Sequence, residues 1–99
     1  MTYDYADEKL WGAIRTLEAG QSPIRERLES ACENHVIKLK SSDLPTNLRS
    51  RFKELHDRLT THVSYHESII NMGDEEACKI EDEILKLYTD LQIIRQRPH

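Results

Sequence analysis

The sequence predicts an all-α protein, a four-helix bundle with up-down-up-down topology, and three observations support this prediction. Charged residues make up 32% of the 99 residues and aromatic residues only 6%, a composition typical of exposed helices rather than strands. Apolar residues recur every three or four positions, which is the spacing of one buried stripe on a helix. Turn and capping signals divide the chain into four such stripes. We therefore expect one helical domain over residues 1–99, with helices at about 4–19, 23–40, 45–71 and 75–96.

The first two helices are predicted to form a short hairpin. Gly20 follows the apolar residues of the first helix and suits the position just after a helix C-terminus. Ser22 and Pro23 then supply a capping residue and a proline at the first helical position. Residue numbers of antiparallel partners in this hairpin should sum to about 42, because both helices rise by the same distance per residue. This rule places Leu10 opposite Cys32.

The last two helices are predicted to form a longer, coiled-coil-like hairpin. Residues 41–43 form a turn, Pro45 falls in the first turn of the third helix, and Gly73 ends that helix before Asp74 caps the next one. Partners across the Gly73 turn should have numbers that sum to about 146. The partners that this rule assigns on the last helix are all apolar: Ile70 faces Ala77, His66 faces Ile80, Leu59 faces Leu87, Leu55 faces Leu91 and Phe52 faces Ile94.

The two hairpins differ in length, and the difference predicts an exposed apolar surface. Helices 4–19 and 23–40 reach only to the level of residues 59–61, so the loop end of the longer hairpin extends about 15 Å beyond them. An apolar patch that stays exposed usually marks a contact with a partner. The residues that we expect to bind a partner are Val63, His66, Ile69, Ile70, Met72, Ala77 and Ile80.

Three arrangements can account for this overhang. Two copies can pack overhang to overhang and complete a four-helix core around a two-fold axis. A different protein can bind there instead. In the third arrangement the helix bends within residues 60–63, where helix propensity is low, and the overhang folds back onto the bundle. The homodimer is the arrangement that we expect.

The charges limit the classes of partner. The net charge of −4 argues against nucleic acid. Seven acidic residues and one basic residue lie between Glu67 and Glu83, which is typical of helix-dipole compensation and solvated faces, although an acidic tip could also dock on a basic partner. No apolar run approaches the roughly 20 residues that cross a membrane, and the N-terminal sequence does not resemble a signal peptide. We expect a cytoplasmic protein without a membrane partner.

A pair of histidines offers an alternative function, the binding of a metal ion. His62 and His66 are four residues apart, so on a continuous helix they would share a face and could bind one zinc ion. Zinc needs three or four ligands, and Glu83 on the facing helix is the nearest further candidate. Neither the His-Glu-x-x-His pattern nor the Glu-x-x-His pattern of di-iron bundles occurs in the sequence.

A catalytic function has less support from the sequence than partner binding or metal binding. Cys32 and His35 could share a helix face, yet a packed histidine is the ordinary explanation, and no nucleophile, base and orienting group lie at one level of the bundle. Apart from zinc in the alternative above, we expect no cofactor. The sequence therefore predicts a small non-catalytic interaction or regulatory protein. It would act through the exposed hairpin surface, with itself or with another protein as its partner.

Overall fold

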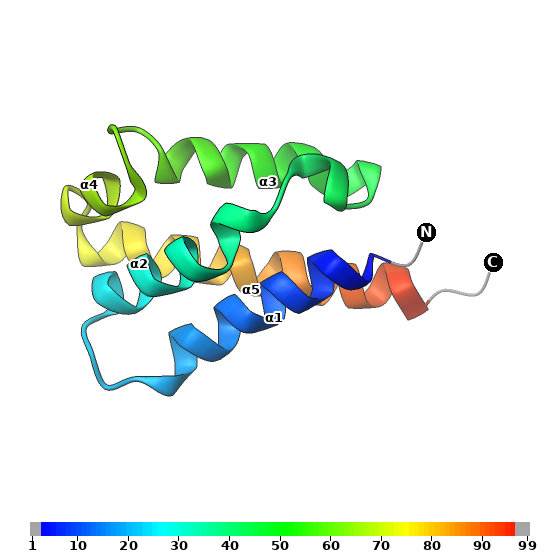
Figure 1. The fold of residues 1–99 in the computed structure, drawn as a ribbon, viewed down its shortest axis with the longest axis horizontal. Coiled ribbons are helices and arrows are strands. Elements are labelled where there is room, and N and C mark those ends of the chain that lie inside the picture. The colour runs from blue at the N-terminus through cyan, green and yellow to red at the C-terminus, as the bar shows by residue number, and fades with distance from the viewer. Residues whose placement is uncertain (1–2, 97–99) are drawn as a thin grey trace.

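A computed structural model describes residues 3–96, and all regular structure in that range is helical (Figure 1). This confirms the predicted all-α class. Two turns of 3₁₀ helix, η1 and η2, join the second helix to the third. The elements in chain order are α1 (Asp4–Ala19), α2 (Ile24–Asn34), η1 (Val36–Lys38), η2 (Ser41–Asp43), α3 (Thr46–Leu59), α4 (Tyr65–Ile70) and α5 (Asp74–Gln96).

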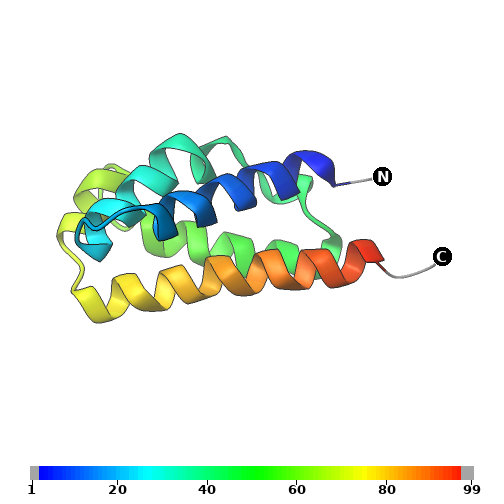
Figure 2. The same ribbon diagram turned by 90° about the horizontal axis from the view of Figure 1, so that it is seen from below.

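α5 runs along most of the molecule (Figure 2), and α1, α2 and α3 pack against it. α1 and α2 pack on each other and on α5, α3 packs on α5, and the short α4 packs between α2 and α3. α2 and α3 are not among the helix pairs that share an extensive contact. The start of α1 and the end of α5 lie at one pole of the molecule, and α4 lies at the other (Figures 1 and 2). None of the helices in the described range is both long and apolar enough to cross a membrane.

Most of the core comes from the apolar stripes that the sequence predicts, although Val63 and Ile70 of the third stripe are exposed. Leu10, Ile14 and Leu17 of α1 are buried, and so are Leu28 and Cys32 of α2. The stripes of the third and last helices are buried as well, over Leu48, Phe52, Leu55, Leu59, Ala77, Ile80, Ile84, Leu87 and Leu91. Burial of apolar side chains along one face of each helix is the main favourable contribution to such a fold.

The second helix is shorter than predicted. It ends at Asn34 rather than near residue 40, and His35 leaves the helical conformation with φ −128° and ψ −59°. The chain continues as η1, where Val36 and Leu39 are both buried. Residues three apart lie on one side of a 3₁₀ turn, so this turn directs both side chains into the core. The neighbouring Ile37 is then left on the outside.

The third helix is not continuous over 45–71, which corrects the prediction of a long coiled-coil-like hairpin. α3 ends at Leu59, and α4 begins only at Tyr65. Residues 60–63 include three β-branched side chains, which lower helix propensity. Ser64 then starts the new helix, because its hydroxyl accepts a hydrogen bond from the Glu67 N–H at 3.1 Å. The structure therefore resembles the third arrangement, in which the overhang folds back.

The break lets α4 fold back against α2 and α3. Ile69, Ala77 and Ile80 are buried within the single chain, so the expectation that they form an exposed surface is wrong. α4 lies against α2, and Arg25 of α2 donates hydrogen bonds to the carbonyls of Ile70 and Met72, at 3.4 and 3.3 Å. These carbonyls at the end of α4 lack helical partners, and a guanidinium group is well suited to satisfy them.

Candidate interaction surface

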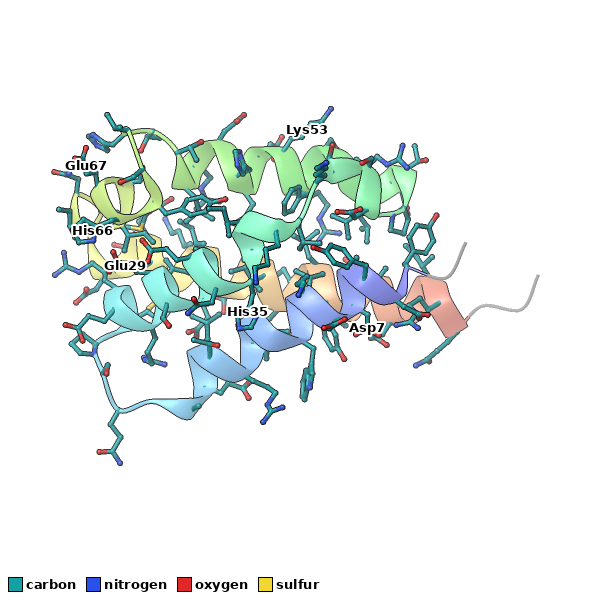
Figure 3. All side chains as sticks on the ribbon, viewed as in Figure 1. Asp7, Glu29, His35, Lys53, His66 and Glu67 are labelled. Atoms are coloured by element: carbon teal, nitrogen blue, oxygen red, sulfur yellow. The ribbon has the colours of Figure 1, made fainter. Side chains whose placement is uncertain are left out.

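The seven residues predicted to bind a partner do not form one surface. Beyond the three that are buried, Met72 is half-buried, and Ile70 is 52% exposed beside α2. His66 is exposed, and its Nδ1 contacts the carboxylate of Glu29 of α2, which Figure 3 shows beside it at the α4 end. Val63, in contrast, is 94% exposed in the segment between α3 and α4. Of the predicted set, Val63 is therefore the apolar side chain most available to a partner.

The structure removes the geometric basis for the predicted zinc site. His62 lies in the segment between the two helices, and His66 lies in the first turn of α4, so they no longer occupy one helix face. The backbone N–H of His62 donates a hydrogen bond to the buried hydroxyl of Ser68 at 3.0 Å, which fixes the path of this segment. Among residues 3–96, no group of three histidine, cysteine, aspartate or glutamate side chains is arranged to hold a metal ion.

An open groove runs along α3 on the side that faces η1, and we call it the seam groove. It consists of two adjoining hollows that share His56 as a lining residue. The larger hollow has a volume of about 510 Å³, and its lining includes Glu33, Ile37, His56, Val63 and Tyr65. The smaller hollow has a volume of about 220 Å³, and its lining includes Leu39, Lys40, Phe52, Lys53, His56 and Asp57.

Aromatic rings line the length of the seam groove. The ring of His56 lies 6.0 Å from that of Tyr65 in an edge-to-face arrangement, and 6.3 Å from that of Phe52. Such spacings allow favourable contacts between aromatic groups. Burial raises the pKa of Tyr65 to about 12, with a further contribution from Cys32, so the phenol remains protonated at neutral pH. Phe52, His56 and Tyr65 thus give the groove a largely aromatic lining.

Two exposed apolar side chains stand at the larger hollow. Ile37 projects from η1 with 56% of its surface exposed, and Val63 projects from the segment after α3. Single exposed apolar residues are ordinary, but a pair beside one hollow is a feature of contact sites. The apolar part of the seam groove is therefore concentrated at its α4 end.

Both hollows of the seam groove have charged side chains in their lining. Lys40, Lys53 and Asp57 line the smaller hollow, while Glu33 lines the larger one. Within the described part of the chain, neither lysine makes an ion pair. Arg51 and Arg58 on the same helix differ, because they pair with Asp90 and Glu76 of α5 at 2.6 and 2.7 Å. The lysines of the groove remain available to an external carboxylate.

Cys32 and His35 do not form a reactive pair. Burial raises the pKa of the Cys32 thiol to about 12, with Glu33 contributing in the same direction, so the nucleophilic thiolate is absent at neutral pH. Burial lowers the pKa of His35, and Lys9 and Lys38 lower it further. The His35 ring packs against Gly12 of α1 (Figure 3). His35 therefore serves the packing of α1 against the end of α2, and Cys32 is part of the core.

The sequence interpretation did not single out Ile37, His56 or Tyr65. One signal could have found part of the groove: Ser64 and Glu67 have the spacing of a helix-starting capping box, which would have placed a helix boundary beside Val63. Ile37 also lies outside the apolar stripe expected for the second helix. No local signal marks His56, because its position depends on how α3 lies relative to η1.

Comparisons with protein-family models, curated proteins and solved structures found no match.

Proposed function

We propose that this chain is a small non-catalytic interaction or regulatory protein that binds a partner polypeptide through the seam groove. The observation that carries the proposal is the pair of exposed side chains, Ile37 and Val63, beside a hollow of about 510 Å³. A concave, apolar site with a few polar groups at its margin is the usual form of a binding pocket. The proposed partner is a polypeptide, either a second copy of this chain or another protein.

The groups with reactive chemistry give this proposal further support. The thiol of Cys32 is buried and protonated, and the imidazole of His35 is packed against Gly12 of α1. The seam groove itself contains His56 and Asp57 but no cysteine, and Ser41 and Ser64 sit at its margins without a histidine partner among the hydrogen bonds. Such a lining favours the binding of a partner over the catalysis of a covalent reaction.

The proposed setting is the cytoplasm. Cys32 and Cys78 are both free, and Cys78 is exposed. Exposed free thiols are ordinary in a reducing compartment and uncommon in secreted proteins.

Affinity capture with the whole chain as bait tests the proposed surface. We expect proteins retained by the wild-type chain to be lost with Val63→Asp and with Ile37→Asp, because each substitution puts a charge where an apolar contact would be desolvated. Ile93→Asp is the matched control, since Ile93 is 49% exposed on α5 and does not line the groove. Thermal unfolding of all three variants checks that their folds are intact.

Two outcomes would contradict the proposed surface. In the first, the groove variants retain the same proteins as the wild-type chain. In the second, the wild-type chain retains nothing above background and also fails to associate with itself.

A further inference from the structure

One side of the seam groove is formed by η1, and a histidine joins this element to α2. Ile37 lines the larger hollow and Leu39 the smaller one, so the position of η1 affects the shape of both. The backbone N–H of His35 donates a hydrogen bond to the Ala31 carbonyl of α2, and its carbonyl accepts one from the Lys38 N–H, both at 3.1 Å. A displacement of His35 would therefore move η1 and change the lining of the groove.

Two contacts hold this junction against α1, on which η1 packs. The ring of His35 lies so close to Gly12 that a Cβ added to the glycine would be 2.6 Å from Nδ1. The hydroxyl of Tyr5 donates a hydrogen bond to the Lys38 carbonyl at 3.2 Å. Because Gly12 has no side chain, the ring can lie against the backbone of α1, where part of its contact with water is lost.

The charged groups that act on His35 are positive. Burial lowers the pKa of His35, and the ammonium groups of Lys9 and Lys38 lower it further. The side chain of Lys9 is only 17% exposed, and its Nζ lies 5.3 Å from the centre of the Tyr5 ring, so its charge is held beside the junction. Charges that are partly buried are screened less by salt than exposed ones.

The neighbouring carboxylates do not pair with His35. Glu8 of α1 lies 3.9 Å from Nζ of Lys9 and is 74% exposed, and Glu33 of α2 is exposed and lines the larger hollow. Arg15, one turn beyond Gly12 on α1, is exposed as well and adds a further positive charge. Within residues 3–96, none of the ion pairs includes His35. A protonated imidazole is therefore disfavoured in this position.

From these observations we infer that His35 is a pH-sensitive switch for the seam groove: its neutral ring holds η1 against α1, and its protonation weakens that contact and displaces Ile37 and Leu39. The inference rests on the proposed function, because it names a way in which binding at this groove is regulated. The contact is complete above the pKa of the unfolded chain, and it is lost as the pH falls through the lower pKa of His35 in the folded chain.

An NMR titration of the whole chain from pH 7.5 to pH 4.5 tests the switch. The methyl signals of Ile37 and Leu39 should shift with the same midpoint as the imidazole of His35, and this midpoint should lie below that of an ordinary histidine. The shared transition should be absent in His35→Gln. His56→Gln is the matched control, since His56 lines both hollows, and it should leave the transition that follows His35 in place.

Removal of one ammonium group tests the cause of the low midpoint. Lys9→Met should raise the midpoint of His35 by roughly half a pH unit, because less positive charge then opposes protonation. Lys86→Met removes an exposed lysine of α5 and should leave the midpoint unchanged. The switch is overturned if the methyl shifts persist in His35→Gln, if they follow His56 instead, or if Lys9→Met has no effect.

Affinity capture at pH 7.5 and pH 4.5 separates the switch from the proposed function. Proteins that the wild-type chain retains through Val63 should be released at the lower pH and should stay bound to His35→Gln. Equal release from both chains would overturn the switch and leave the proposed function standing. If the titration gives the shared midpoint but the chain neither captures a protein nor associates with itself, the coupling of His35 to η1 is supported and the proposed function alone is wrong.

Discussion

Two sides of this molecule are built from the same kinds of helices but differ in how completely they are closed. The packed side consists of α1, α2 and α5, which contact one another directly. The seam consists of α3, η1 and the segment 60–64, between which the groove remains open.

Side-chain size and backbone shape explain the difference. The packed side uses Ala6, Ala13 and Ala31, all fully buried, so the helix backbones can approach closely. The seam instead has Ile37 and Val63 on irregular backbone, where neither side chain has a neighbouring helix to cover it. Close packing of one side of the molecule therefore depends on small residues where helices meet as much as on the total number of apolar residues.

The ion pairs follow the same division. Arg95 near the end of α5 pairs with Asp4 and Asp7 of α1, which holds the two helix ends together on the packed side. The lysines of the groove have no such partners within the described residues. On the packed side the charged groups already have partners within the chain, so they contribute little to the binding of an external partner. The seam retains unpaired lysines and exposed apolar side chains that can contact one.

Truncation of one aliphatic side chain on each side should give the largest contrast. Leu10 is fully buried on α1, so Leu10→Ala should lower the free energy of unfolding by about 3 kcal/mol through lost burial and the cavity that remains. Ile37→Ala should lower it by less than about 1 kcal/mol, because that side chain is already half exposed in the single chain. Urea unfolding at low protein concentration measures both values. Equal losses would mean that the seam is as well packed as the core.

A methyl group at Gly12 should produce a smaller effect on the packed side. An added Cβ there would lie 2.6 Å from Nδ1 and 2.7 Å from Cε1 of His35, so the ring must move. We expect Gly12→Ala to destabilise the fold by about 1 kcal/mol, since the strain exceeds the gain in helix propensity. In a His35→Ala background the same substitution should be neutral or stabilising. A double-mutant cycle by thermal unfolding would reject the close contact if the two effects were additive.

The pH dependence of His35 should be the smallest of the three effects. Burial, Lys9 and Lys38 hold its pKa below the ordinary value of a histidine, so the unfolded chain takes up a proton first as the pH falls. The contribution of His35 to stability is therefore complete above the unfolded pKa and is lost as the pH falls towards the folded pKa. The drop in unfolding temperature between pH 7.5 and pH 5.5 should be smaller for His35→Gln than for the wild-type chain. A larger drop in the variant would show the opposite sign.

Periodic patterns predicted the core well. The stripe on the last helix and the boundaries of the first helix at residues 4 and 19 agree with the structure, because one buried face and a clear glycine stop define these helices locally. The predicted bundle topology goes further than the structure supports, since five helices rather than four are present in residues 3–96. The additional helix comes from the break at residues 60–64.

The surface could be predicted only in part. Val63 was expected to contact a partner and is exposed. Ile69 is buried because α4 folds back against α2 and α3, and Ile80 of α5 is buried as well. The direction taken by a chain after a break depends on contacts distant in sequence, here those that Arg25 makes with the end of α4. The spacing of apolar residues indicates which side chains are buried, but it does not indicate which part of the chain buries them.

The shortness of α4 has a consequence for the order in which the molecule opens. Six residues form fewer than two helical turns, and an isolated helix of this length has no stability of its own in water. α4 therefore persists only while it is docked, and its release costs less free energy than unfolding of the whole chain. Amide hydrogen exchange would register this release as a separate cooperative unit. Local opening at this pole would briefly expose Tyr65 and Ile69, the apolar side chains of α4 that are buried while it is docked.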